Sequence, residues 1–237
     1  MFYDWLTPSH FIMLGLLLGF AIAHSGLAAL RPWGEEKIGA RAYRVIFALV
    51  SLPLAVILII YFFNHRYDGA QLWMLQGIPA LKPTVWVLSF ISFLFLYPAT
   101  FNLLEVAAVA KPQVRVYETG IIRVCRHPQM VGQVIWCVAH TLWLGTSFTL
   151  VTSLGLILHH VFGVWHGDRR LAKRFGESFE TLRSRTSIFP FLAILRGQQT
   201  LVWQEFLRPS YLGVVLFVLG FWWAHPFLIR ATGNVAW

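Results

Sequence analysis

The chain has 237 residues, of which 57% are hydrophobic and only 12% are charged, so it carries too few charges to cover a soluble domain of this size. Its two cysteines, Cys125 and Cys137, exclude a disulfide framework or a four-thiolate metal site within one chain. The formal net charge of +9 would suit a nucleic-acid ligand, but the distribution of the basic residues argues against that partner.

Six mostly apolar stretches follow one another along the chain, at about 11–30, 45–62, 84–101, 131–144, 150–165 and 212–229. A helix needs roughly 20 mostly apolar residues to cross a bilayer, whose interior offers no water to unpaired backbone groups. The fourth and fifth stretches are short, and the turn residues Gly145-Thr146-Ser147 between them predict a tight helical hairpin. We therefore predict an all-α integral membrane protein with about six transmembrane helices, in a single transmembrane domain over residues 1–237.

Lys and Arg residues are concentrated in alternate connections between these stretches. Sixteen of the 19 lie in 31–44, 102–130 and 165–208, and the other connections and the tail hold three. Because positive residues gather on the cytoplasmic or stromal side of a membrane, both termini are predicted on the side opposite the basic loops. The basic side is expected to contact anionic membrane lipid, and no nucleic-acid partner is expected.

The first predicted span follows the sequence MFYDWLTPSH, which has one acidic and no basic residue. It lacks the basic region of a cleavable signal and the Arg and Ser richness of a transit peptide, which predicts a retained helix. Within this span Gly15, Gly19 and Ala23 recur every four residues. That spacing is typical of a face packed against another helix, although a porphyrin or polyene would fit the same groove.

A basic amphipathic sequence, HGDRRLAKRFGESFETLRSR, occupies residues 166–185. Leu171, Phe175, Phe179 and Leu182 are the apolar residues of one face, and Arg and Lys lie on the other. We predict a basic amphipathic helix that lies in the membrane interface; a surface helix packed on its neighbours is the alternative.

Histidines within the apolar stretches are the first candidate site. Ionisable residues at hydrocarbon depth are costly, so they usually have a partner or a function. A single such histidine most often forms a hydrogen bond across helices, but His24, His140 and His159 come from three separate spans, and Cys137 lies one turn from His140. Imidazole and thiolate are both ligands of haem iron, so this set favours a metal or haem site. Zinc is less suitable because few carboxylates or thiolates are near, and copper stays open.

The ligand pair is not settled by depth along the helices. At about 1.5 Å per residue, His24 lies roughly 10 Å and His159 roughly 12 Å from the basic side, and His140 about 15–18 Å. Depth alone pairs His24 with His159, while tilt of the helices is large enough to blur the difference.

A polar cluster precedes the fourth span. Glu118 and Thr119 suit a helix start, and Pro128 suits a break just before the span. Arg126 and His127 would then lie at the membrane interface, either as charges that anchor the helix end or as a polar mouth that binds an anionic group such as a haem propionate.

The run RHPQMVGQVIWCVAHTLWLGTSF, from Arg126 to Phe148, resembles the signature of the 15-cis-zeta-carotene isomerases, which belong to the wider NnrU-type membrane family. The resemblance extends over essentially the whole chain; the further matches are His24-Ser25, the Arg31-Pro32 turn and the RFGESFE segment at 174–180.

This resemblance implies a haem b enzyme of carotenoid biosynthesis that converts 9,15,9'-tri-cis-zeta-carotene to 9,9'-di-cis-zeta-carotene. The family's axial ligands carry over onto His24 and His140, and Cys137 matches an alternative ligand of the oxidised iron. His65, His127 and His159 match further family histidines. The resemblance also implies a polyene substrate, neighbouring carotenoid-pathway enzymes as partners, and a cyanobacterial thylakoid, plasma or plastid membrane as the location.

Two other functions remain open from the sequence. The Arg-His-Pro motif at 126–128 and Phe175-Gly176 also match membrane methyltransferases of the isoprenylcysteine or phospholipid type. In this chain, however, Gln129-Met130 replaces the usual aromatic residue and Gly167-Asp168 replaces the usual acidic pair. A haem-binding electron-transfer protein, or a denitrification accessory protein, is the non-enzymatic alternative, because bis-histidine ligation suits electron transfer equally well.

Overall fold

The computed structural model describes residues 5–96 and 116–232, which are helical apart from loops and one isolated β-bridge between Gln71 and Thr146. The six long helices are α1 (Pro8–Ile38), α2 (Ala40–His65), α3 (Leu81–Leu96), α6 (Pro128–Leu144), α7 (Ser147–Phe175) and α10 (Pro209–Thr232). The short elements are α5 (Ile121–Val124), α8 (Glu177–Arg185), α9 (Leu192–Leu195) and the 3-10 helix η1 (Trp203–Phe206).

Each predicted apolar stretch corresponds to one of the long helices, although residues 97–101 of the third stretch lie outside the described residues. Among the described residues, four helices are long and apolar enough to cross a membrane: α1, α2, α7 and the Tyr211–Ala231 part of α10. Helix α3 is apolar but shorter, and α6 has 17 residues. The all-helical, membrane-type class is therefore confirmed.

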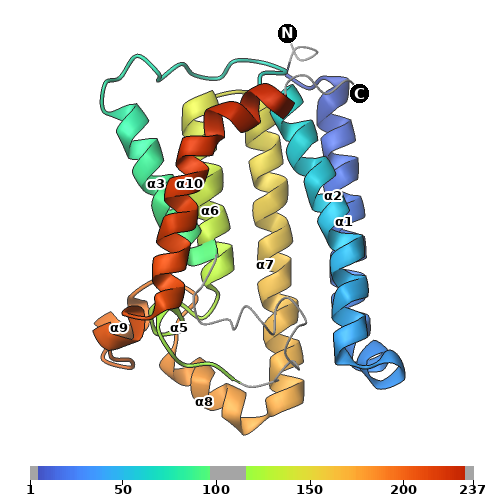
Figure 1. Ribbon diagram of the computed structural model, residues 1–237, viewed down its shortest axis with the longest axis vertical. Helices are drawn as coiled ribbons and strands as arrows, with labels where there is room; N and C mark the ends of the chain where they lie inside the picture. The colour runs from blue at the N-terminus through green and yellow to red at the C-terminus, as the bar shows by residue number, and fades with distance from the viewer. Residues whose placement is uncertain (1–4, 97–115, 233–237) are drawn as a thin grey trace.

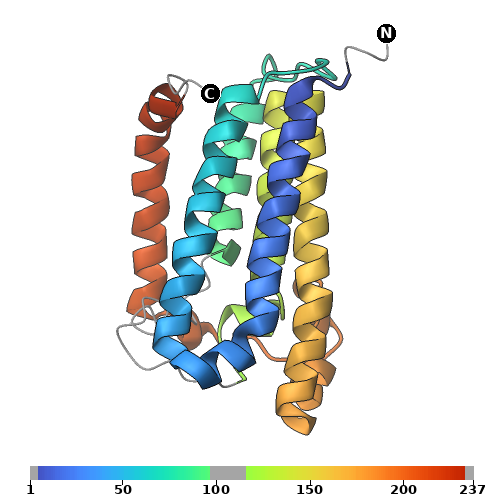
Figure 2. The ribbon, with the colours of Figure 1, turned by 90° about the vertical axis from the view of Figure 1, so that its right-hand side faces the viewer.

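The long helices run side by side as a bundle (Figures 1 and 2). Helix α1 packs on α2 and α7, α6 packs on α3 and α7, and α10 packs on α3 and α2. The start of α1, the end of α10 and the α6–α7 turn lie at one end of the bundle, and α8 and α9 lie at the other (Figure 1). We call these the hairpin end and the α8 end.

The α6–α7 connection is the predicted tight hairpin. Gly145 ends α6 in the left-handed conformation, with φ of 64°, and a Cβ there would lie 2.2 Å from the Trp73 carbonyl oxygen. Thr146 caps α7, because its side chain accepts a hydrogen bond from the Thr149 backbone N–H at 3.2 Å. Only glycine fits the first position, and the threonine satisfies one of the free N–H groups of the new helix.

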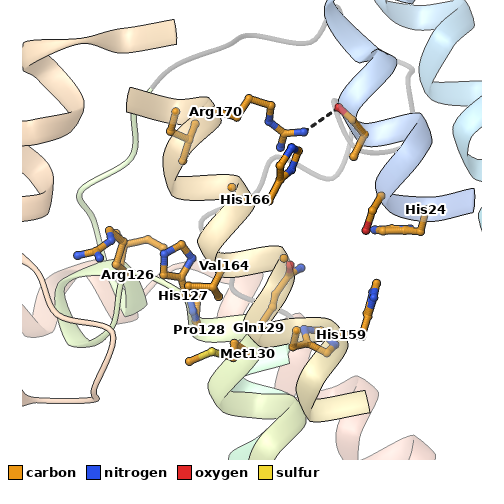
Figure 3. Close-up of a pocket in the computed structure, with 17 residues that line it drawn as sticks. His24, Arg126, His127, Pro128, Gln129, Met130, His159, Val164, His166 and Arg170 are labelled. Carbon is orange, nitrogen blue, oxygen red and sulfur yellow. Dashed lines mark hydrogen bonds between the residues drawn. The ribbon is translucent and has the colours of Figure 1, made fainter. Parts of the chain in front are cut away.

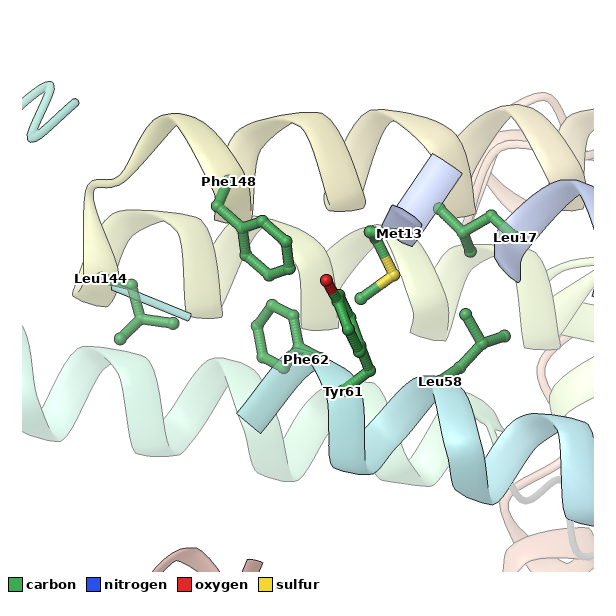
Figure 4. Close-up of a cluster of buried hydrophobic side chains, with 7 residues drawn as sticks. All are labelled: Met13, Leu17, Leu58, Tyr61, Phe62, Leu144 and Phe148. Atoms are coloured by element: carbon green, nitrogen blue, oxygen red, sulfur yellow. The ribbon is translucent and has the colours of Figure 1, made fainter. Parts of the chain in front are cut away.

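Two apolar clusters hold the bundle together. The larger one lies towards the hairpin end between α1, α2, α6 and α7 (Figure 4), and it consists of Met13, Leu17, Leu58, Tyr61, Phe62, Leu144 and Phe148. The second lies where α3, α5 and α6 meet, and its buried members are Phe95, Ile121, Val124, Cys125 and Val131. This second cluster anchors the segment that leads into α6.

Helices α3 and α6 approach each other most closely at Gly132. A Cβ at this position would lie 2.7 Å from both the Ser92 carbonyl oxygen and the Leu96 backbone nitrogen. The Ser92 hydroxyl donates a hydrogen bond to the Gly132 carbonyl at 2.8 Å. The missing side chain therefore sets the distance between the two backbones.

The structure changes two expectations on helix surfaces. The basic sequence at 166–185 is not one helix: its first part extends α7 to Phe175, the chain turns at Gly176 with φ of 53°, and the remainder is α8. Glycine adopts that backbone angle without steric cost. Gly15 and Gly19 are exposed, and a Cβ at either would meet nothing within 4 Å, so the described chain does not use this stripe for helix packing.

Candidate functional site

A cavity of about 360 Å³ lies between α1, the start of α6 and the second half of α7 (Figure 3). Its volume is in the range of small-molecule sites. The side chains that line it and can bind a metal or an anion are His24, Arg126, His127, His159, His160, His166 and Arg170. Histidine and arginine side chains therefore surround a space whose other lining residues are mostly apolar.

Helix α7 supplies more of the lining than any other helix. His159, Gly163, His166 and Arg170 follow one another at spacings of four, three and four, which places them along one side of a helix. A Cβ at Gly163 would meet nothing within 4 Å, so this position adds open space to the cavity. The face exists because α7 continues through the basic sequence to Phe175.

His24 of α1 and His159 of α7 meet across the cavity (Figure 3), with ring centroids 6.0 Å apart and planes at 73°. Phe20 packs on both rings, at 5.2 Å from His24 and 5.4 Å from His159, and Phe47 packs on His24 at 4.8 Å. The Nδ1 atoms of both histidines are buried and have no hydrogen-bond partner in the described chain. The two rings are therefore held by aromatic packing rather than by hydrogen bonds of these nitrogens.

Arg126 and His127 form the polar mouth, where Asp168 of α7 binds both. The Asp168 carboxylate accepts a hydrogen bond from Arg126 Nη2 at 3.0 Å and lies 2.7 Å from His127 Nε2. Arg126 Nη1 also donates to the Thr186 carbonyl oxygen at 3.2 Å. The Arg126 and Asp168 side chains are only 8% and 16% exposed, so this network is largely desolvated.

A second guanidinium reaches the cavity from α7. Arg170 Nη1 donates a hydrogen bond of 2.8 Å to the Ala28 carbonyl oxygen of α1, which the dashed line in Figure 3 marks. Two guanidinium groups from opposite sides of the mouth give it a cationic character, which Asp168 offsets only in part. Such a mouth suits a ligand with carboxylate or phosphate groups.

The segment that carries Arg126 is held by an ion pair behind it. Glu205 accepts hydrogen bonds from Arg123 Nε at 2.8 Å, from Arg123 Nη2 at 2.9 Å and from the Gly120 backbone N–H at 2.5 Å. The Arg123 bonds hold the pKa of the Glu205 carboxyl below its usual value, and burial opposes this effect. Burial raises the pKa of the Cys125 thiol to about 11, so this cysteine is a buried neutral group.

His140 and Cys137 of the predicted set lie elsewhere in α6. His140 stacks on Trp136 with ring centroids 3.9 Å apart, and its Nδ1 lies 2.9 Å from the Trp136 carbonyl oxygen. Cys137 is buried, and its sulfur accepts a hydrogen bond from Gln133 at 3.5 Å. Neither residue lines the cavity, whereas His24, His159, Arg126 and His127 do. Within residues 5–96 and 116–232 no three His, Cys, Asp or Glu side chains converge as a bare metal ion would require.

Three residues of this site are not singled out by any sequence pattern, namely Asp168, His166 and Arg170. In the sequence, Asp168 stands out only as a departure from the methyltransferase pattern. His166 and Arg170 continue the face of His159 and Gly163 once α7 is extended through the basic sequence, whereas Asp168 lies on the other side of the helix and is placed only by its contacts with Arg126 and His127.

The architecture and the cavity define a class: an all-helical protein of membrane type, with a histidine-lined cavity and a cationic mouth at one end of the bundle. The family described as NnrU protein matches residues 12–232. The chain belongs to this family.

Two curated relatives are similar over nearly the whole chain. Both are described as "15-cis-zeta-carotene isomerase, chloroplastic": one from Arabidopsis thaliana is 57% identical over 228 residues, and one from Zea mays is 56% identical over 229. Each alignment covers 95% of this chain, and the chain spans 62% and 63% of the length of these relatives. No solved structure matches the chain.

Proposed function

We propose that this protein is a haem-dependent cis-trans isomerase that converts 9,15,9'-tri-cis-zeta-carotene to 9,9'-di-cis-zeta-carotene. The observation that carries the proposal is the 57% identity, over 95% of the chain, to a relative whose description is 15-cis-zeta-carotene isomerase. The histidine-lined cavity inside an apolar bundle supports it, because histidine is a common metal and haem ligand and apolar helices suit a long apolar substrate.

Haem b is the cofactor we propose for this cavity. His24 and His159 line the cavity and would contact the cofactor, and imidazole is a common ligand of haem iron. Arg126 and Arg170 at the mouth would bind its carboxylates, for which forked guanidinium donors are well suited. When bound, haem supplies an iron centre that interacts with the conjugated double bond and lowers the barrier to rotation.

Side chains of the protein itself would position the ligand groups. Phe20 and Phe47 pack on the His24 ring and hold it in place. Asp168 holds the Arg126 and His127 side chains at the mouth, so both donors are in place before a ligand arrives. The isomerisation has no net oxidation or proton transfer, so these residues need to position groups rather than exchange protons.

We propose six membrane spans, which are the four longer helices together with α3 and α6. The α8 end, which carries most of the basic connections, would face the cytoplasm or stroma, and the hairpin end would face the opposite side. The two relatives are described as chloroplastic, which supports a plastid or thylakoid-type membrane for this chain. Membrane lipid and neighbouring carotenoid-pathway enzymes are the partners we propose.

The test is carotenoid profiling in bacteria that accumulate zeta-carotene, with and without this gene, grown in darkness. We expect the 9,15,9'-tri-cis isomer to fall and the 9,9'-di-cis isomer to rise only when the gene is present. An unchanged isomer composition, with the protein present in the membrane, would overturn the proposal.

The same preparation separates the two alternative functions. Purified protein with a Soret band but no change in isomer composition would favour an electron-transfer or denitrification accessory role. Transfer of a labelled methyl group from S-adenosylmethionine to lipid or isoprenylcysteine, without a Soret band, would favour the methyltransferase.

A further inference from the structure

We infer that residues 189–208, which connect α8 to α10, form an interfacial anchor that inserts apolar side chains into an anionic membrane leaflet. We call these residues the anchor segment. The inference goes beyond the proposed isomerase and does not depend on it. It is carried by the exposed apolar residues of the segment, by the arginines beside them, and by the burial of the apolar face of α8.

The anchor segment exposes large apolar side chains although it does not belong to a membrane-length helix. Leu207 is 84% and Leu195 is 82% exposed, which are the highest values among the large hydrophobic side chains of the described residues. Phe189, Phe191 and Trp203 are also exposed. Large exposed apolar areas mark sites of interaction with a membrane or a protein. The lipid around the long helices does not by itself explain these five residues, because all of them lie outside those helices.

The inner side of the anchor segment is already packed. Ala193 is buried, and Ile194, Leu201 and Phe206 pack on the apolar cluster where α3, α5 and α6 meet. Within the described chain this inner side has its partners, so the outward residues are available to the surroundings of the bundle.

Polar contacts behind the anchor segment fix it to the bundle. The Gln199 amide, which is buried, accepts a hydrogen bond from Arg123 Nη1 at 2.9 Å and donates one to the Glu118 carboxylate at 3.0 Å. Glu205 binds the same Arg123 through two further hydrogen bonds. A rigid mount favours insertion, because side chains on a fixed backbone lose less conformational entropy when they are buried. Arg123 lies three residues before Arg126, so the anchor and the mouth of the cavity share this mount.

The position of the anchor segment agrees with a membrane boundary. Figure 1 shows α9 beside the start of α10 and α8 farther along the bundle axis. Leu207 lies four residues before the apolar span of α10 begins at Tyr211. Apolar side chains at this level reach the boundary between headgroups and acyl chains, where interfacial segments bury their apolar face.

The charges beside the apolar residues identify the lipid. Arg196 directly follows Leu195, Arg208 directly follows Leu207, and both arginines are exposed. Lys and Arg near a membrane surface are attracted to anionic headgroups, and this attraction adds to the burial of the neighbouring apolar groups. The occupant we infer is therefore an anionic lipid leaflet.

Helix α8, the second part of the sequence predicted to lie in the interface, does not offer such a surface. Its apolar residues Phe179 and Leu182 are 1% and 6% exposed, because they pack on the rest of the protein. The residues of α8 that are exposed are all polar. Helix α8 is therefore a surface helix packed on its neighbours, and the interfacial contact falls to the anchor segment.

The test places one bimane label at a time on the full chain in lipid nanodiscs that contain phosphatidylglycerol. The labelled variants are Leu195→Cys and Leu207→Cys, whose high exposure means that the change removes little internal packing. Thr181→Cys is the matched control, because Thr181 is exposed on α8 outside the anchor segment. Cys125 and Cys137 are buried, so the label goes to the introduced cysteine.

Lipids with brominated acyl chains should quench the labels on Leu195→Cys and Leu207→Cys and shift their emission to shorter wavelength relative to water. Iodide in the buffer should quench only the label on Thr181→Cys. Replacing phosphatidylglycerol by phosphatidylcholine, or adding the double change Arg196→Gln/Arg208→Gln, should reduce the quenching by the brominated chains.

Equal iodide quenching of Leu195→Cys and Thr181→Cys in the anionic nanodiscs would overturn the inference. Protection of the Leu195→Cys label that appears only after a membrane extract is added would also overturn it, because the surface would then belong to a protein partner. The expected pattern in a chain that leaves zeta-carotene isomers unchanged would sustain the anchor and refute the isomerase alone.

Discussion

Removing the Asp168 carboxylate should destabilise the protein far more than removing an exposed carboxylate on the neighbouring helix. Asp168 bonds both Arg126 and His127, and the Arg126 side chain is only 8% exposed. Leaving one partner of a fully buried pair uncompensated costs 3–5 kcal/mol. Since Asp168 is 16% exposed, we expect about 2–3 kcal/mol for Asp168→Ala.

The matched control is Glu180→Ala. Glu180 pairs with Arg183 at 3.5 Å, but their side chains are 53% and 55% exposed, so this pair is worth about 0.5 kcal/mol. For a chain of this length, Asp168→Ala should lower Tm by roughly 5–10 °C and Glu180→Ala by about 2 °C or less.

The assay is thermal unfolding of detergent-purified protein, followed by the loss of circular dichroism. The double variant Asp168→Ala/Arg126→Met should recover part of the lost stability, because it removes the unpaired cation together with the carboxylate. Equal Tm values for Asp168→Ala and Glu180→Ala would refute the reasoning that the mouth network is desolvated.

Three further predictions concern the elements that hold the site. Gly132→Ala should lower the free energy of unfolding by about 1–3 kcal/mol, because the added methyl group overpacks α3 against α6. Gly213→Ala is the control and should leave Tm unchanged, because a Cβ there meets nothing within 4 Å. Equal changes in Tm for the two variants would contradict the close approach of α3 and α6. The pKa of Glu205 is lowered in the folded protein, so this carboxylate contributes stability above its usual pKa of 4.5. That contribution should disappear as the pH falls through the lower pKa of the folded state. If a Glu205→Gln variant showed the same fall in Tm at acid pH, the role of the Arg123 pair would be disproved. Cys125 should resist maleimide at pH 7 until the protein unfolds, because its pKa is raised to about 11 and it has no exposed surface. Rapid labelling of this residue in the folded protein, located by peptide mapping, would contradict its burial.

Much of the fold was predictable because it depends on local sequence. Apolar stretches predicted every long helix, and Gly145 with Thr146 predicted the hairpin, since a left-handed glycine and a capping threonine act within a few residues. The end of α7 was not predictable in this way. Its basic second half reads as part of a separate amphipathic helix until the tertiary structure extends α7 to Phe175.

The sequence by itself determined that several histidines would lie among apolar residues and that Arg126 and His127 would stand before a helix. Only the tertiary structure decided which of these groups meet. The contact of His24 with His159, and of Asp168 with the Arg126-His127 pair, depends on the relative register of α1, α6 and α7. That register is set by packing between helices distant in the chain, so a pattern within any one helix does not contain it.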